Sequence, residues 1–172
     1  FEGAYIGGDK YLQRQALQNA IIVKQPKFGY HGEVSIPLPV VVKATNSSGK
    51  KGISLATTNE ELQKSIEYAK SASCNEKVLI EEYLTDGTEY SIECLSYRGK
   101  HLIIQTTQKD NSGPPHFVEL GHHQPGKLQD ILFEQLQKAA AEILDSIGII
   151  NSVSHVEVKI IDGSIYFIEL GA

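Results

Sequence analysis

The segment VSHVEVKIIDGSIYFIEL, residues 153–170, decides the fold of this chain. Residues 153–160 alternate between polar and apolar side chains, and a second β-rich run covers residues 164–170. Asp162-Gly163 stands between the two runs and is typical of a tight turn. The segment therefore predicts an antiparallel β-hairpin with one face on a core and the other toward solvent.

The length of the turn decides whether Glu157 and Glu169 share a face, because side chains alternate along a strand. With a two-residue turn, Glu157 lies opposite Ile168, and Glu169 points to the other face. With a three-residue turn, Ile161-Asp162-Gly163, Glu157 lies opposite Phe167 and Glu169 is its diagonal neighbour, about 7 Å away between Cβ atoms. Two carboxylates at that spacing suit a hard cation. The alternative is an ordinary solvated strand face.

Upstream of the hairpin, helical and strand patterns alternate as in an α+β domain. Predicted helices follow a cap at Asp9, a capping box of Thr58 with Glu61, and an apolar stripe that ends before Gly148. They cover residues 9–20, 58–69 and 128–147. Predicted strands cover residues 40–42, 78–80, 89–96 and 100–107. Residues 21–39 are expected to be loop with at most one short strand, and residues 108–125 mostly loop.

A polar loop at residues 46–52 follows the strand 40–42 directly. Lys43 ends that strand, Ser47 and Ser48 offer hydroxyl donors, and glycines allow unusual backbone dihedrals. Backbone amides in such a loop and a lysine at a strand end suit phosphate oxygens. The alternative is a flexible surface turn, and Lys10 taken alone is an ordinary helix residue.

Composition narrows the class of protein. Hydrophobic residues make up 41% and charged residues 22%, which is typical of a soluble globular domain. The net charge is −5 and no basic run is present, so no nucleic-acid footprint exists. No apolar stretch approaches the roughly 18 residues of a membrane span. We expect Cys74 and Cys94 to be reduced, half-buried thiols of a cytoplasmic protein.

The ordered set of motifs resembles the ATP-grasp superfamily of carboxylate–amine ligases, as in the ATP-binding domains of biotin carboxylase, carbamoyl phosphate synthase and L-amino acid ligase. In chain order, the motifs are Asp9-Lys10, the strand 39–43, the loop 47–52, residues 78–84, residues 87–91, residues 155–159 and residues 165–169. Each motif is weakly specific, but their order and spacing together are strongly specific.

The resemblance implies ATP and Mg²⁺ (or Mn²⁺) as cofactors and a role for each matching residue. Lys10 and Lys43 would contact the ATP phosphates, and the loop with Ser47, Ser48, Gly49 and Gly52 would close over them. Glu81, with the backbone of Glu82 and Leu84, would read the adenine edge, while Tyr83 would mainly pack. Glu89 would hold the ribose hydroxyls, and Glu157 and Glu169 would be magnesium ligands.

The resemblance also implies a fold and a division into lobes. We expect an α+β ATP-grasp fold in which two small lobes sandwich the nucleotide between antiparallel sheets. Residues 1–24 would lead into the domain as a linker and helix. Residues 25–96 would form the small lobe with its glycine-rich lid, and residues 97–172 a larger lobe that is truncated at its C-terminus.

The activity implied is ATP-dependent ligation, in which a small-molecule carboxylate becomes an acyl phosphate that an amine attacks. The resemblance also implies that the segment with His122 and His123 contacts these substrates; the alternative is a solvated loop with incidental histidines. Gly171 occupies the usual position of an asparagine metal ligand, and this departure favours an alternative, a degenerate module that binds nucleotide without turnover. The chain starts at Phe1, so we expect it to be part of a parent protein with further N- and C-terminal parts. A homodimer of that protein is compatible with the sequence.

Overall fold

The computed structural model describes residues 2–114 and 119–172, and the strands in this part of the chain form two antiparallel sheets. The smaller sheet has the order β1-β4-β2-β3, with β1 Phe28–Tyr30, β2 Val40–Ala44, β3 Ile53–Ala56 and β4 Val78–Glu82. The larger sheet has the order β7-β6-β5-β8-β9, with β5 Thr88–Tyr97, β6 Lys100–Asn111, β7 Glu119–His123, β8 Ser152–Ile161 and β9 Ser164–Gly171. The predicted α+β class is confirmed.

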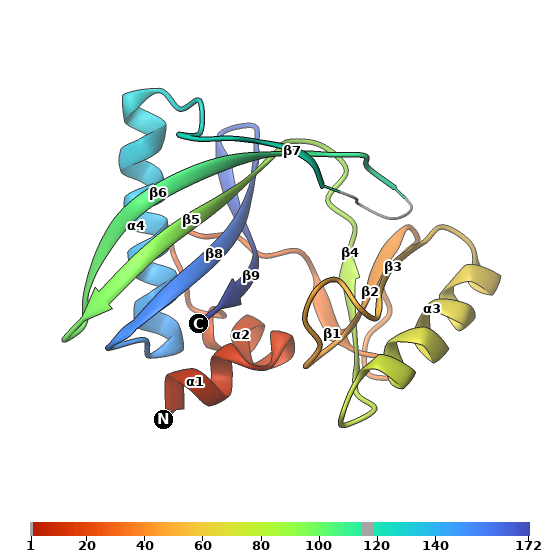
Figure 1. The fold of residues 1–172 in the computed structure, drawn as a ribbon. Helices are drawn as coiled ribbons and strands as arrows, with labels where there is room; N and C mark the ends of the chain where they lie inside the picture. Colours follow the sequence, from red (N-terminus) through yellow and green to blue (C-terminus); the bar gives the residue numbers. More distant parts are fainter. Residues whose placement is uncertain (1, 115–118) are drawn as a thin grey trace.

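Helices cover the outer face of each sheet (Figure 1). The helices are α1 Glu2–Gly7, α2 Lys10–Ala16, α3 Asn59–Ala72 and α4 Asp130–Ile147. In Figure 1, α3 lies on the outside of the smaller sheet, α4 lies behind the larger sheet, and α2 lies near the place where the two sheets approach. The two sheets therefore turn their uncovered faces toward the middle of the molecule.

Local sequence signals account for the helix boundaries. The Asp9 carboxylate accepts hydrogen bonds from the backbone N–H groups of Tyr11 and Leu12, at 2.9 and 3.1 Å, and so caps α2. Thr58 and Glu61 form the predicted capping box at α3. Gly148 takes a left-handed conformation with φ of 80° directly after α4. However, α2 ends at Ala16, four residues before the predicted end.

Each sheet has its own apolar core on the helix side. In the smaller sheet, Val40, Val42 and Ile80 pack with Ile66 of α3. The core of the larger sheet is formed by apolar residues of β5, β8, β9 and α4, which are Tyr90, Ile92, Cys94, Val156, Val158, Ile165, Phe167, Leu170, Leu136, Ala139, Ala140, Ile143, Leu144 and Ile147. Because alternate strand residues point away from these cores, charged residues such as Lys43 and Glu157 are directed between the sheets.

Three segments differ from the sequence-based expectations. The segment 108–125, expected to be mostly loop, contains the end of β6 and all of β7, which pair from Gln108↔His123 onward. β3 was not predicted, and it pairs with β2 directly after the polar loop. β5 belongs to the larger sheet, so the lobe boundary expected after residue 96 would cut through that sheet. We propose that the lobes divide at residues 83–87, where the chain passes between the sheets.

The hairpin of β8 and β9 adopts the shorter of the two turns considered and still brings Glu157 and Glu169 to one face. Ile161 pairs with Ser164, so the turn has two residues, Asp162 and Gly163, with φ of 48° and 74°. The two-residue alternative is therefore the one adopted, although its regular register would place the two glutamates on opposite faces. A β-bulge instead interrupts the ladder after Val158↔Phe167, and the next pair is Glu157↔Glu169. The extra residue, Ile168, brings the two glutamates opposite each other on one face.

Two further features concern the surface and the thiols. In the part of the chain that the structure describes, no helix combines the length and the apolar character needed to cross a membrane. Both cysteines are free, and Cys74 is exposed whereas Cys94 is buried. The expectation that both thiols are half-buried is thus wrong for each, because Cys94 faces the α4 core and Cys74 follows the exposed end of α3.

Candidate functional site

A cavity lies between the two sheets and contains about 890 Å³ of empty space, part of it open to solvent. Its walls come from β2, β3 and β4 on one side and from β5 to β9 on the other. Eight predicted site residues line it, namely Lys43, Glu81, Glu82, Tyr83, Leu84, Glu89, Glu157 and Glu169. The cavity also contains side chains that the sequence analysis did not select, namely Lys50, Lys109, Glu119, Lys159 and Ile168.

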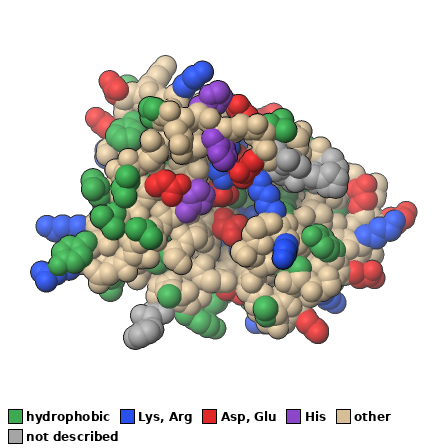
Figure 2. All heavy atoms as spheres, in the orientation of Figure 1, with side chains coloured by type: hydrophobic (Ala, Val, Ile, Leu, Met, Phe, Trp, Pro, Cys, Tyr) green, Lys and Arg blue, Asp and Glu red, His purple; other side chains and the backbone are tan. Residues whose placement is uncertain are grey.

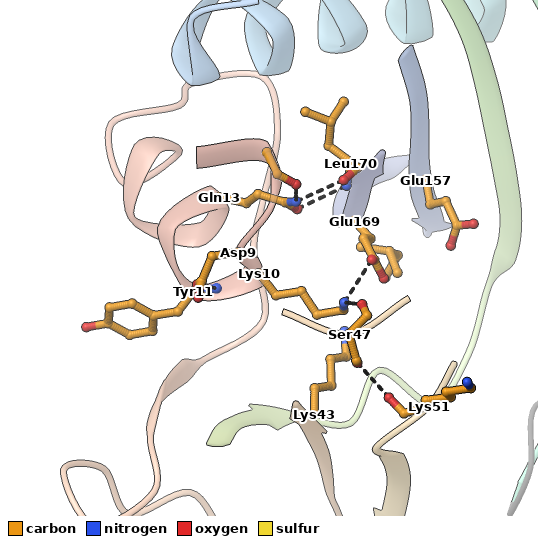
Figure 3. A network of polar contacts seen from close by, with 12 residues as sticks. Asp9, Lys10, Tyr11, Gln13, Lys43, Ser47, Lys51, Glu157, Glu169 and Leu170 are labelled. Carbon is orange, nitrogen blue, oxygen red and sulfur yellow. Dashed lines mark hydrogen bonds and ion pairs between the residues drawn. The ribbon is translucent and has the colours of Figure 1, made fainter. Parts of the chain in front are cut away.

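Glu157 and Glu169 form the acidic pair of this cavity. They are direct cross-strand partners, and Figure 3 shows their carboxylates on the same side of β8 and β9. Their side chains are 28% and 30% exposed, so both are partly screened yet still reachable from the cavity. Carboxylate oxygens of this kind fit a hard divalent cation, which would complete its shell with waters and phosphate oxygens.

Glu157 is held as a carboxylate by two basic neighbours. Lys109 Nζ lies 2.5 Å from its Oε1, and His155 Nε2 lies 3.1 Å from the same oxygen. Burial alone would raise the pKa of Glu157, but the hydrogen bond from His155 and the Lys109 ammonium outweigh it and lower the pKa to about 2. His155 is in turn bonded through Nδ1 to Glu93, at 2.6 Å. The Glu157 carboxyl group is therefore ionised at neutral pH.

Lys10 contacts both Glu169 and Ser47 of the predicted phosphate loop. Lys10 is buried, and its Nζ lies 2.9 Å from Glu169 Oε1 and donates to the backbone oxygen of Ser47 at 2.6 Å (Figure 3). The Ser47 hydroxyl donates to the Lys51 carbonyl at 2.6 Å, which closes the loop on itself. A residue at the first position of α2 thus joins the loop of the smaller lobe to the acidic pair of the larger sheet.

Lys43 and Glu81 belong to a buried ion-pair network. Lys43 Nζ lies 2.7 Å from Glu81 Oε2, and Arg14 Nε lies 2.7 Å from Glu81 Oε1. Burial would raise the pKa of Glu81, but the Arg14 and Lys43 charges outweigh it and lower the pKa to about 2. Each carboxylate oxygen is engaged by one cation, so the side chain orients Lys43. The adenine contact expected of Glu81 stays a prediction.

The loop 46–52 reaches the cavity through Lys50. Of its residues, Lys50 lines the cavity, and its Nζ lies 3.0 Å from Glu119 on β7. Ser47, Ser48, Gly49 and Gly52 do not line it, although Gly49, Lys50 and Gly52 all have positive φ, as a tight polar loop requires. A Cβ atom at Gly52 would lie 2.7 Å from that of Ala72, so the loop packs tightly on α3 there.

The opposite end of the cavity is the connection from β4 to β5. Lys159 Nζ donates to the Leu84 backbone oxygen at 2.8 Å, so β8 of the larger sheet supports this connection. Tyr83, Leu84 and Glu89 line the cavity beside it. Lys159 lies two residues after Glu157 in a predicted strand. This spacing was the sequence signal that Lys159 and Glu157 share one face of the strand.

The two predicted substrate histidines lie on β7 and outside the cavity lining. His122 Nε2 lies 3.1 Å from Glu119, and His123 Nε2 lies 2.8 Å from Asp110. Glu119 also faces Lys50 and Lys109, at 3.0 and 3.5 Å, so His122 adjoins the rim of the cavity. In Figure 2, acidic, basic and histidine side chains gather along the middle of the face shown.

Comparisons with known proteins identify the fold. The model of the ATP-grasp domain matches residues 36–172. A D-alanine--D-alanine ligase of Flavobacterium psychrophilum is 29% identical over 79% of this chain and 42% of its own length. Dapdiamide A synthase of Enterobacter agglomerans is 26% identical over 100% of this chain and 43% of its own length. The chain thus spans less than half of either relative.

A solved structure agrees with these matches. The L-amino acid ligase of Bacillus licheniformis superposes with a TM-score of 0.82 at 23% sequence identity, covering 99% of this chain and 41% of that one. At this identity the likeness concerns the fold. The family match, by contrast, covers most of the sequence, including every strand from β2 to β9. The chain therefore belongs to the ATP-grasp domain family.

Proposed function

We propose that this chain binds ATP with Mg²⁺ or Mn²⁺ in the cavity between its sheets and serves an ATP-dependent carboxylate–amine ligase. The observation that carries the proposal is the pairing of Glu157 with Glu169 inside a cavity that also contains several lysines. The families named by the relatives, D-alanine--D-alanine ligase and dapdiamide A synthase, support a ligase.

Glu157 and Glu169 would hold the metal, which would neutralise phosphate charge and orient the transferred phosphoryl group. At present each carboxylate is bonded to a lysine, Lys109 and Lys10 respectively. If these carboxylate oxygens held the metal, the ammonium groups of Lys109 and Lys10 would be released to contact the phosphate oxygens, since lysine is a flexible point charge. The Lys109–Glu157 and Lys10–Glu169 ion pairs would therefore be exchanged for contacts with Mg·ATP when the nucleotide binds.

The remaining residues would each contact a different part of the nucleotide. Lys43, fixed by Glu81, would contact the phosphates beneath the loop that carries Ser47, Ser48, Gly49, Lys50 and Gly52. The backbone of Glu82 and Leu84 would read the adenine edge, beside Tyr83. Glu89 at the start of β5 would accept hydrogen bonds from the ribose hydroxyls. Lys159 would hold the adenine end in place through its bond to the Leu84 oxygen.

In the reaction we propose, a substrate carboxylate oxygen attacks the γ-phosphorus of ATP, ADP leaves, and an acyl phosphate forms. An amine then attacks the acyl carbon, phosphate leaves, and the amine loses a proton. The part of this chain is to position the phosphates and to stabilise charge on the transferring group. We propose His122 and His123 as substrate contacts because β7 borders the cavity through Glu119.

A second function, nucleotide binding without turnover, is favoured by one observation. Gly171 pairs with His155 on the face of the acidic pair, where a side chain could have supplied a third oxygen ligand. Across residues 2–114 and 119–172, no group of three or more His, Cys, Asp or Glu side chains could hold a metal. A site with only two protein ligands depends more on the phosphates and waters, so slow or absent turnover would follow.

Phosphate release by the full-length protein separates the two functions. The protein is incubated with ATP, Mg²⁺ and each member of a panel of amino acids and other small carboxylates, with and without a second compound that supplies the amine. The ligase predicts phosphate release that depends on a particular carboxylate and amine. A rate that stays at the substrate-free background across the panel, despite measurable ATP binding, would favour the binding module.

A further inference from the structure

The outer edge of β9 is bonded along its length, although β9 is the edge strand of the larger sheet. Lys24 N–H donates to the Ile165 oxygen at 2.8 Å, and Phe167 N–H donates to the Lys24 oxygen at 2.9 Å. Farther along, the Gln13 side chain donates to the Leu170 oxygen at 2.8 Å and accepts from its N–H at 3.0 Å. Side chains of α2 thus take the place of a neighbouring strand.

Arg14 bonds this edge at the bulge itself. Its Nη1 donates to the Phe167 oxygen at 2.5 Å, and its Nη2 donates to the Ile168 oxygen at 3.0 Å. The guanidinium also lies over the Phe167 ring, 5.0 Å from the centroid. Its side chain is 1% exposed, so these bonds are made away from solvent. Its remaining bond, to Glu81, reaches the smaller sheet.

The bulge decides where Glu169 points. Phe167 and Leu170 are buried in the α4 core, while the two residues between them, Ile168 and Glu169, both line the cavity. Without the extra residue, strict alternation would place Glu169 on the same side as Phe167, away from Glu157. The carbonyl groups that Arg14 binds are those of the residue before the bulge and of the bulged residue, Phe167 and Ile168.

We infer that Arg14 is a positioning residue for the metal ligand Glu169, acting through the bulge at Ile168, and that the inference rests on the metal site proposed above. The same guanidinium holds Glu81, which holds Lys43. One buried side chain therefore determines the positions of both the acidic pair in the larger sheet and the proposed phosphate lysine, Lys43, in the smaller sheet. Groups that orient metal ligands from behind are commonly worth 10–100-fold in metal affinity.

The test measures Mn²⁺ affinity by electron paramagnetic resonance in the presence of a non-hydrolysable ATP analogue. Arg14→Met removes the donors and keeps much of the apolar stem, while Arg14→Lys keeps a charge for Glu81 but cannot span both carbonyl groups. We expect Arg14→Met to weaken Mn²⁺ binding about 10–100-fold and Arg14→Lys to weaken it less. Leu17→Ala is the matched control, because Leu17 is equally buried nearby but contributes to the apolar core only.

A double-mutant cycle shows whether Arg14 acts through Glu169. Adding Arg14→Met to Glu169→Gln should cost little further Mn²⁺ affinity, whereas independent effects would multiply. A readout without metal is hydrogen exchange, which should accelerate at residues 164–171 in both Arg14 variants and much less in Leu17→Ala.

Two outcomes would overturn the positioning role. One is Mn²⁺ affinity in the Arg14 variants that matches the wild type or falls no further than in Leu17→Ala. The other is unchanged exchange at residues 164–171 in Arg14→Lys. If the wild-type chain binds no Mn²⁺ with nucleotide, the proposed metal site fails, and the exchange measurement alone then decides whether Arg14 holds the bulge.

Discussion

Replacement of Glu81 by Gln should destabilise the protein strongly, because it leaves two buried cations without their counter-charge. Glu81 and Arg14 have side chains that are 4% and 1% exposed, and the Lys43 side chain is 8% exposed. Removing one partner of a buried ion pair costs about 3–5 kcal/mol. The pKa of Glu81 gives a second estimate, since lowering it from 4.5 to about 2 corresponds to about 3 kcal/mol of folding free energy.

The same shift predicts how the effect depends on pH. The folded-state pKa of Glu81 is depressed, so its contribution is fully present above the unfolded pKa of 4.5 and is lost as pH falls toward about 2. The free energy of unfolding, measured by urea denaturation, should therefore differ between wild type and Glu81→Gln by about 3 kcal/mol at pH 7. The difference should shrink steadily below pH 4.5, because protonated Glu81 resembles glutamine.

Glu60→Gln is the matched control. Glu60 pairs with Lys64 at 2.7 Å on the surface of α3, with both side chains more than 70% exposed. Such a pair contributes at most about 0.5 kcal/mol. If Glu81→Gln is no more destabilising than Glu60→Gln at pH 7, or if its effect stays constant down to pH 3, the reasoning on the buried network is refuted.

Three further predictions concern the cavity and the fold. Lys159→Met removes the donor to the Leu84 oxygen and should weaken ATP binding about tenfold in a fluorescent-nucleotide competition assay. The exposed Lys100→Met is the control, and equal ATP affinities of the two variants would argue against adenine binding beside Leu84. Gly171→Asn adds an amide oxygen on the face of Glu169, and a new Cβ atom at this position meets nothing within 4 Å. The substitution should therefore tighten Mn²⁺ binding, and unchanged or weaker binding would show that residue 171 does not face the metal. Thr58→Ala removes the capping box of α3 and should cost about 1 kcal/mol in thermal denaturation without changing nucleotide affinity, and a Tm equal to that of the wild type would contradict the cap.

Much of the fold could be predicted from sequence because its signals are local. Asp9, Thr58 with Glu61, and Gly148 mark helix boundaries through bonds within a few residues. The Asp162-Gly163 turn was visible for the same reason. The short strand β3 and the strand β7 were missed, since four or five residues in a polar, glycine-rich context carry little periodicity and gain their structure from partners.

The site was predictable in its residue types but not in its geometry. The order of the motifs placed Lys43, Glu157 and Glu169 together, and the structure brings all three to one cavity. The register that aligns the two glutamates could not be predicted, because the bulge is bonded by Arg14 from more than 150 residues away. The partners of Glu81 were missed for the same reason, since one of them comes from α2 and the other from β2.

The position of the bound metal tests the account most directly. Nuclear magnetic resonance of the labelled chain with a non-hydrolysable ATP analogue would compare spectra before and after substoichiometric Mn²⁺, which broadens signals near the ion. The account predicts broadening centred on residues 155–159 and 167–171, lost in the Glu157→Gln, Glu169→Gln double variant. Broadening centred elsewhere, or unchanged in that variant, would contradict the assignment of the paired glutamates as the metal site.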